Sequence, residues 1–455
     1  MPRLTFRTAL AALLGLMLAT CTLAEGTSAL PDYLTAEYGS PPADIPSGPI
    51  SAALDTDLKT VFVDSLEQSV WGDAQKAALA RIKASNDPRL AWIITDMMRF
   101  TWRATFDDAL ADAAAHLLQV ELKTPQRWGE LTDYLIAWDI PAFPGYLGTK
   151  RAIFTQFQPS WKPLFVPGKI DWRMVSWGGV PMDARRFDTT DEPCNCIPAA
   201  DNPEVQPAAE ATWLKDSDVV FGIEINGEAR AYPRRIMEVR EMVNDTLGGR
   251  DLGIPYCTLC GAAQAYFTDR LPAGVDRPVL RTSGLLIRSN KVMFDLNTFS
   301  VFDTFLGTAV TGTLAQKGIQ LEQATVITTD WGTWKAEYPH TTVLLERYAL
   351  GRDFNFREGR DARGPIFPVG DVDPRLSVHE DVIGVVGPAG PVAFARGAAL
   401  VALSNGAEVR QDGVQLLQAA GGLRAVDAIG KPLPSHEAFW FAWSQFHEGT
   451  ALWQP

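Results

Sequence analysis

Amphipathic helical patterns dominate the first third of the chain. Apolar residues recur there every three or four positions, as on the buried face of a helix. The stretches with this pattern begin near Asp73, Pro88, Asp107 and Pro125. A capping residue precedes two of these prolines (Asp87 and Thr124), which is typical of a helix start. The pattern predicts an antiparallel α-helical array over residues 48–165, and a HEAT-like repeat is one interpretation of it.

Alternating apolar and polar positions with tight turns replace this pattern from about residue 213. Alternation of this kind favours β-strands with one buried face. Asn226-Gly227 separates two such runs, and Asn-Gly is the strongest short signal for a hairpin. Further runs at 285–288, 292–295 and 300–305 predict an antiparallel meander.

Two blocks of the strand-rich region recur later in the chain. The gap-free alignments are 218–234 with 380–396, and 331–344 with 440–453. Both members of the second pair begin with Trp-x-x-Trp. We therefore expect an α+β multidomain protein, with the helical array followed by a mainly-β domain built from two unequal tandem halves. The halves are residues 190–345, which carry a C-x-x-C insertion, and residues 375–455.

The first residues have the pattern of an export signal. Arg3 and Arg7 precede a short apolar run and a small-residue cleavage site. We interpret 1–24 as a signal peptide and 25–47 as a linker, which predicts an exported protein in the periplasm or outside the cell. A lipid anchor at Cys21 is a weaker alternative, because the threonine before this cysteine fits a lipobox poorly.

Composition and charge narrow the classes of partner. The chain has 455 residues, 46% hydrophobic and 21% charged, which is typical of a folded globular protein. A net charge of −13 without a basic run argues against binding nucleic acid. The mean hydropathy is −0.03, and we expect no membrane span. A protein partner on the helical array remains open.

Cysteines carry the candidate chemistry. Cys194 and Cys196 form a C-x-C motif, and Cys257 and Cys260 form a C-x-x-C motif. One interpretation is stabilising disulfides, for which four cysteines allow three pairings. A second is a metal site in which the four sulfurs bind zinc or copper, since thiolates favour such ions. A third is thiol–disulfide exchange at the C-x-x-C motif.

These interpretations give three hypotheses for the function. The first is a binding module with a cysteine-lined ligand or metal site, the second a redox protein that uses Cys257 and Cys260, and the third a scaffold with stabilising disulfides. Glu241, Asn244 and Arg288 are the candidate ligand-binding residues near these motifs. The chain has no H-E-x-x-H, G-x-S-x-G or P-loop motif, so no catalytic residue is assigned and enzymatic activity stays open. We interpret His436-Glu437 as the start of a helix, and we assign no catalytic role to His447.

Several stretches together resemble one bacterial family. They are 197–203, 222–233, 243–245, 256–261, 283–286 and 292–295. With them, the chain resembles the family known as domain of unknown function 3179 over about residues 190–455. The resemblance implies no activity. It also shows departures, because Arg240 and Thr258 stand where members of the family usually have histidine and proline.

Overall fold

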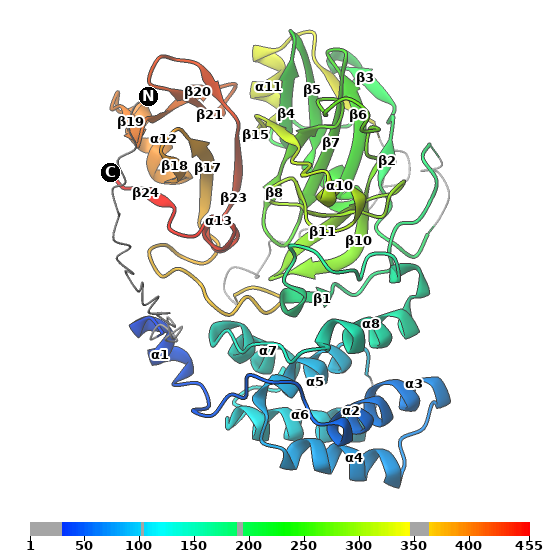
Figure 1. Cartoon of the computed structure of the whole chain (residues 1–455). Helices are drawn as coiled ribbons and strands as arrows, with labels where there is room; N and C mark the ends of the chain where they lie inside the picture. The colour runs from blue at the N-terminus through cyan, green and yellow to red at the C-terminus, as the bar shows by residue number, and fades with distance from the viewer. Residues whose placement is uncertain (1–29, 102–103, 189–193, 346–363) are drawn as a thin grey trace, which may run out of the picture.

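The computed structural model describes residues 30–101, 104–188, 194–345 and 364–455. Helices form the N-terminal part, and five small sheets form a mainly-β C-terminal region in a propeller-like ring (Figure 1). The α+β organisation is therefore confirmed. Among the described residues, no helix has both the length and the apolar character needed to cross a membrane. The predicted signal peptide, with Cys21, lies outside the described residues.

Eight α-helices form the described N-terminal part. They are α1 (Asp32–Tyr38), α2 (Ala52–Lys59), α3 (Ser65–Gln68), α4 (Asp73–Ala84), α5 (Ala91–Met98), α6 (Ala104–Leu118), α7 (Arg127–Ala137) and α8 (Tyr146–Phe157). The cap at Asp87 is confirmed, because its carboxylate accepts a hydrogen bond from the backbone N–H of Arg89 at 3.1 Å. The comparison with a HEAT array stays a prediction.

Part of the predicted linker is ordered structure. Helix α1 lies within it and buries Leu34. The Tyr33 hydroxyl donates to Asp371 at 2.5 Å, and the Tyr38 hydroxyl donates to the carbonyl of Gly370 at 3.2 Å. Composition suggested a linker because prolines and glycines flank this short helix, whereas contacts distant in sequence hold it in place.

The five sheets are named here after a central strand. The β11 sheet contains, in spatial order, β1 (Val175–Trp177), β10 (Leu280–Ile287), β11 (Asn290–Asp295), β12 (Val301–Asp303) and β13 (Thr308–Ala309). The β7 sheet contains β14 (Glu322–Ala324), β9 (Ala265–Phe267), β7 (Arg250–Cys257), β6 (Met242–Leu247) and β2 (Ala200–Asp201), and β8 (Ala262–Ala263) also pairs with β7. The β4 sheet contains β15 (Ile327–Asp330), β4 (Val219–Ile225), β5 (Glu228–Pro233), β16 (Thr342–Leu344) and β3 (Val205–Pro207).

The last two sheets form the C-terminal part of the chain. The β17 sheet contains β23 (Ser435–Phe439), β17 (Asp381–Gly387), β18 (Gly390–Ala395) and β24 (Ala451–Trp453). The β20 sheet contains β19 (Val409–Gln411), β20 (Val414–Ala419), β21 (Gly422–Asp427) and β22 (Pro432–Leu433). The helices between strands are α9 (Arg234–Arg240), α10 (Gly312–Gln316), α11 (Trp331–Glu337), α12 (Arg396–Ser404) and α13 (Trp440–Phe446).

The predicted hairpin and meander are both present. Strands β4 and β5 pair antiparallel around Asn226 and Gly227, whose φ angles of 52° and 85° suit a tight hairpin turn. Strands β10, β11 and β12 pair antiparallel in sequence order. The predicted helix start at His436-Glu437 is wrong, because both residues lie in β23 and α13 begins at Trp440. The strand continues to Phe439 because its residues pair with β17.

The β4 and β17 sheets share one topology. Their orders are β15–β4–β5–β16 and β23–β17–β18–β24, and in each the last pair is parallel. The indole N–H of Trp334 donates to Thr341 at 2.9 Å, and that of Trp443 donates to Thr450 at the same distance. The aligned sequence blocks therefore occupy equivalent places in these two sheets. The division of the whole β-rich region into tandem halves stays a prediction.

Candidate functional site

The C-x-x-C motif lies in a tight turn at the end of a central strand. Strand β7 ends at Cys257, and the N–H of Cys260 donates to the Cys257 carbonyl at 3.2 Å. Strand β8 then returns along β7, with Ala262 opposite Cys257. The turn places the two cysteine side chains next to each other.

A second turn closes over the two sulfurs. Both cysteines are buried thiols outside any disulfide. Arg288 and Ser289 form the turn between β10 and β11 with φ angles of 44° and 70°. The carbonyl oxygen of Ser289 lies 3.8 Å from the Sγ of Cys257 and 3.6 Å from that of Cys260. Asn290 contributes its Oδ1 at 3.4 Å from the Cys260 Sγ. The two sulfurs therefore share a small polar pocket inside an apolar cluster.

A buried ion pair lies beside the thiols. Lys291 is 4% exposed, and its Nζ lies 3.3 Å from Oε2 of Glu241. The same ammonium donates to the backbone carbonyls of Glu241 and Tyr256. Thr258, between the two cysteines, donates its hydroxyl to Oε1 of Glu241 at 3.0 Å. Helix α9 ends at Arg240, and Glu241 follows it in the left-handed conformation with a φ of 50°. This change of direction places the Glu241 side chain beside Lys291.

These neighbours change the acidity of the nearest thiol. Burial and the charge of Glu241 raise the pKa of Cys257, but the hydrogen bond with Cys260 and the N–H and ammonium of Lys291 together lower it. Burial also lowers the pKa of Lys291, against the attraction of Glu241 and the cysteines. The Cys257 thiol is therefore prepared to lose its proton beside Lys291.

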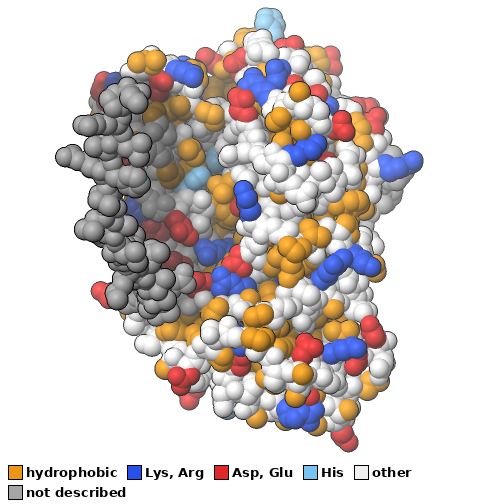
Figure 2. Space-filling view, in the orientation of Figure 1, with side chains coloured by type: hydrophobic (Ala, Val, Ile, Leu, Met, Phe, Trp, Pro, Cys, Tyr) orange, Lys and Arg blue, Asp and Glu red, His pale blue; other side chains and the backbone are white. Residues whose placement is uncertain are grey.

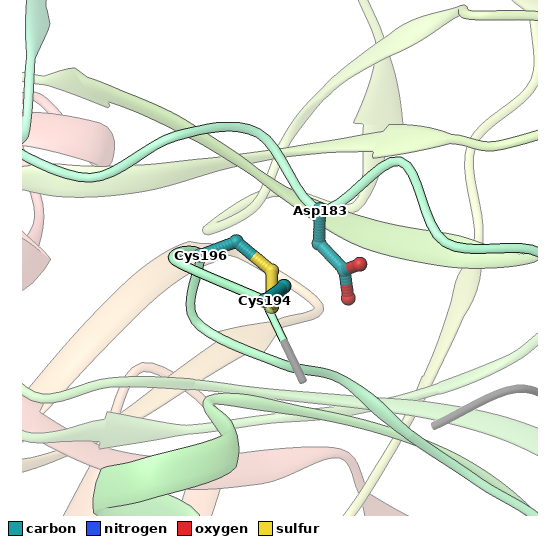
Figure 3. Close-up of side chains that lie close together, drawn as sticks. All are labelled: Asp183, Cys194 and Cys196. Atoms are coloured by element: carbon teal, nitrogen blue, oxygen red, sulfur yellow. A yellow bond between two sulfur atoms is a disulfide. The ribbon is translucent and has the colours of Figure 1, made fainter. Parts of the chain in front are cut away.

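The other cysteine pair forms a separate site. Cys194 and Cys196 are joined by a disulfide, with Cα atoms 5.1 Å apart (Figure 3). Their sulfurs and a carboxylate oxygen of Asp183 form the one group of three potential metal ligands within 4.8 Å of one another among the described residues. Asp183 already accepts hydrogen bonds from Arg185 and from the N–H of Ala199, at 2.8 and 2.9 Å.

This arrangement corrects the interpretation of a four-cysteine metal site. Within the described residues, the two motifs do not bring four sulfurs together. It also excludes a disulfide between the motifs, because Cys194 and Cys196 bond to each other while Cys257 and Cys260 remain thiols. Two cysteines separated by one residue can form a disulfide with each other, but the sequence does not show whether they do so or pair with other cysteines.

A comparison with known families matches residues 194–428, just over half of the chain, to a family described as a protein of unknown function, DUF3179. The chain belongs to this family. The match contains both cysteine motifs and Lys291, and it leaves out the N-terminal helices. No curated protein and no solved structure matches the chain.

The other predicted site residues do not all lie at the thiol pocket, which is the polar pocket around the sulfurs of Cys257 and Cys260. Asn244 lies in β6, where its amide nitrogen donates to Asp201 at 2.8 Å and to the Leu280 carbonyl at 3.0 Å. Arg288 lies in the turn over the thiols but lines a small cavity against the helices. Arg240, which the resemblance aligns with a histidine usual in the family, is buried and donates to the carbonyl of Pro198 at 3.4 Å. Of the three candidates for ligand binding, Glu241 is the one that accepts a hydrogen bond from the C-x-x-C motif, through Thr258.

Sequence reasoning missed two residues of this pocket. Lys291 and Ser289 belong to the predicted meander, and nothing in its alternation shows that its first turn faces the C-x-x-C motif. A lysine directly before the apolar run 292–294 was the available signal, because a buried lysine needs a charged or polar partner.

Proposed function

We propose that DUF3179 proteins of this type act through a dithiol–disulfide pair formed by Cys257 and Cys260. One observation carries the proposal: a thiol with lowered pKa lies against a second thiol within one tight turn. A pair that exchanges electrons needs a stabilised thiolate and a partner sulfur that can reach it. The Cα atoms at the ends of such a turn lie close enough for a disulfide.

The reaction is an exchange with a low-molecular-weight disulfide. The thiolate of Cys257 attacks one sulfur of that disulfide, which forms a mixed disulfide and releases one thiolate. Cys260 then loses its proton and attacks the Cys257 sulfur, which releases the second half of the reactant as a thiol. The protein pair gives up two electrons and becomes a disulfide, and the reactant becomes one thiol and one thiolate.

Burial determines which reactants can take part. Cys257 is 3% exposed and Cys260 is fully buried. Segment 438–443 covers them, and the Phe439 N–H donates to the Cys260 carbonyl at 2.8 Å. A small reactant, or local opening of this cover, is therefore required. The predicted export signal supports the proposal, because it would place the pair in an oxidising compartment.

Metal binding at the same pair is the second candidate. Two thiolates suffice for a copper(I) ion, whereas zinc in structural sites takes four ligands. The ammonium of Lys291 next to the sulfurs favours a thiolate but repels a metal cation. This repulsion is why we place redox exchange first.

The test measures how fast iodoacetamide alkylates Cys257 as a function of pH, with each cysteine followed by peptide mass spectrometry. Lys291→Met should raise the pKa of Cys257 and Glu241→Gln should lower it, because the charges of these residues act in opposite directions. A change of one unit alters the alkylation rate below the pKa about tenfold. The double variant should lie between the two, and it removes the unpaired buried charge of each single variant.

Equilibration with glutathione mixtures then tests the exchange itself. A Cys257–Cys260 disulfide should form reversibly, while a Cys194→Ser/Cys196→Ser control leaves its midpoint unchanged. Thiols that stay reduced in every mixture while copper(I) binds at one equivalent would move the assignment to the metal site. If the cysteine variants lowered the melting temperature but changed neither thiol exchange nor copper binding, the cysteines would have only a stabilising role, as in the scaffold hypothesis.

A further inference from the structure

A cavity of about 360 Å³ lies between the β7 and β17 sheets. Its lining includes Phe305, Gln323, His436, Trp443 and His447. Figure 2 shows a hollow between the two β-rich parts of the molecule, with hydrophobic and histidine side chains inside it. The volume falls within the usual range for small-molecule sites. Neither cysteine motif lines this cavity, although Trp443 belongs to the segment that covers the thiols.

Aromatic rings form rigid walls. His447 packs on Trp443 with ring centroids 4.0 Å apart, and Phe305 stacks on Phe446 at 5.0 Å. The backbone carbonyl of Phe305 accepts hydrogen bonds from Gln264 and Tyr266. Fixed aromatic side chains of this kind suit a flat ligand, because contact with an aromatic ring is then possible without reorganising the walls.

His436 brings an unpaired hydrogen-bonding group to the cavity. The residue is 3% exposed, and its Nδ1 lies 2.8 Å from the amide nitrogen of Gln323. An amide nitrogen only donates, so Nδ1 accepts and the neutral ring carries its proton on Nε2. This Nε2 is buried and has no hydrogen-bond partner among the described residues. Burial of a donor without an acceptor costs free energy, which an acceptor atom in the cavity would recover.

The equivalent sheet shows that the fold does not require this histidine. In the β17 sheet, His436 lies opposite Gly384. In the β4 sheet, Ile327 lies opposite Gly222 at the equivalent position. An apolar side chain therefore serves the same place in the same topology, and the polar group in the β17 sheet needs another explanation.

The second histidine shows the same contrast. His447 follows α13 and packs on Trp443, whereas Tyr338 follows α11 and packs on Trp334 with centroids 4.4 Å apart. Both sheets keep this pair of packed rings, but the histidine is found in the β17 sheet and a tyrosine in the β4 sheet. Burial lowers the pKa of His447 to about 4, and burial together with His447 lowers that of His436 to about 3. Both rings are therefore neutral near pH 7.

The charge of the cavity defines the ligand further. Glu322 is the one charged side chain among the described residues that line it. We propose that this cavity binds a small, neutral, planar aromatic molecule whose carbonyl oxygen accepts a hydrogen bond from the Nε2–H of His436. The ring of the ligand contacts the aromatic walls, and the absence of Lys and Arg among the described lining residues disfavours a carboxylate.

Benzamide is a suitable probe, with binding followed by ligand-observed NMR. It should bind more tightly than cyclohexanecarboxamide, which has no aromatic face, and more tightly than benzoate, which carries a charge. His436→Ile introduces the side chain of the equivalent position and should weaken benzamide binding at least tenfold. Tyr338→His introduces into the β4 sheet the histidine that the β17 sheet has at His447, outside the cavity, and should leave the affinity unchanged. The affinity of the unaltered protein should stay constant between pH 5.5 and pH 8.

A second variant keeps the test decisive if His436→Ile folds poorly. Val386 lines the cavity and is 57% exposed, so Val386→Trp should fill the entrance without disturbing the core and should abolish binding. Equal affinity in the unaltered protein and in both variants would overturn the proposal. So would tighter binding of benzoate than of benzamide, or no benzamide binding at all at millimolar concentration.

Discussion

Buried ionisable side chains lie at both proposed sites, but they are charged at the thiol pair and neutral at the cavity. At the thiol pocket, Lys291 and Glu241 are paired, and their charges act on Cys257. At the cavity, His436 and His447 are neutral because burial disfavours their charged forms. In the proposed functions, the first arrangement stabilises a reactive thiolate, and the second keeps a neutral ring that can donate a hydrogen bond to a ligand.

Acid should destabilise the fold through the two histidines. The pKa of each is lowered from 6.5 in the unfolded chain to about 3 for His436 and about 4 for His447. The unfolded state therefore binds more protons, so this stability is present above pH 6.5 and is lost as the pH falls toward 4. At pH 5 the loss should be about 2 kcal/mol for each histidine.

Urea unfolding at pH 7.5 and pH 5 measures this loss. In His436→Ile, the drop in the free energy of unfolding between the two pH values should be smaller by about 2 kcal/mol. The exposed His340 supplies the control, because His340→Gln should leave the drop unchanged. An equal drop in all three proteins would show that His436 is protonated in the folded state.

Local sequence signals predicted the elements well where the signal and the structure are both local. The Asn226-Gly227 hairpin and the cap at Asp87 each depend on a few adjacent residues, and both are present. The thiol pocket was only half predictable. The C-x-x-C motif was visible in the sequence, but Lys291 reaches it through the pairing of a distant strand, which no local pattern encodes. His436 was assigned to a helix because its strand runs directly into α13.

The matched sheets depend on a glycine that faces a tryptophan ring. A Cβ at Gly384 would lie 2.0 Å from the ring of Trp443, and one at Gly222 would lie 2.2 Å from that of Trp334. Either alanine must displace a buried ring, so Gly384→Ala and Gly222→Ala should each lower the free energy of unfolding by about 3 kcal/mol. Chemical denaturation measures the effect.

Gly397 in α12 is the matched control for these two substitutions. It is exposed, and a Cβ added at this position would meet no atom within 4 Å. Gly397→Ala should therefore leave stability unchanged or raise it by up to about 1 kcal/mol, since alanine favours a helix. If Gly397→Ala lowered the free energy of unfolding as much as Gly384→Ala, the cause would be the loss of glycine's backbone freedom and not the contact with the ring.

The helices, which lie outside the family match, share one hydrophobic core with the β-rich region inside it. The helical residues pack in the same hydrophobic cluster as Leu285, Val292 and Phe294 of the β11 sheet. Strand β1 comes from the helical side of the chain and pairs with β10. The indole N–H of Trp161 donates to the Ser283 carbonyl at 2.7 Å. The turn over the thiols also belongs to the β11 sheet. The helices therefore contact the candidate redox site indirectly, by packing against the sheet that carries this turn.

A chain that begins at residue 194 should therefore fail to fold as a native unit, although the family match begins there. It loses β1 and exposes the apolar face of the β11 sheet, which residues 30–188 cover in the full protein. We expect this fragment to aggregate or to bind a hydrophobic dye, without a cooperative thermal transition. A chain of residues 30–455 should unfold cooperatively, and its thiol pair should keep the alkylation profile of the full protein. A soluble 194–455 fragment with a sharp transition and the same Cys257 profile would show that the β-rich region folds independently of the helices, as the division of the sequence at residue 165 predicts.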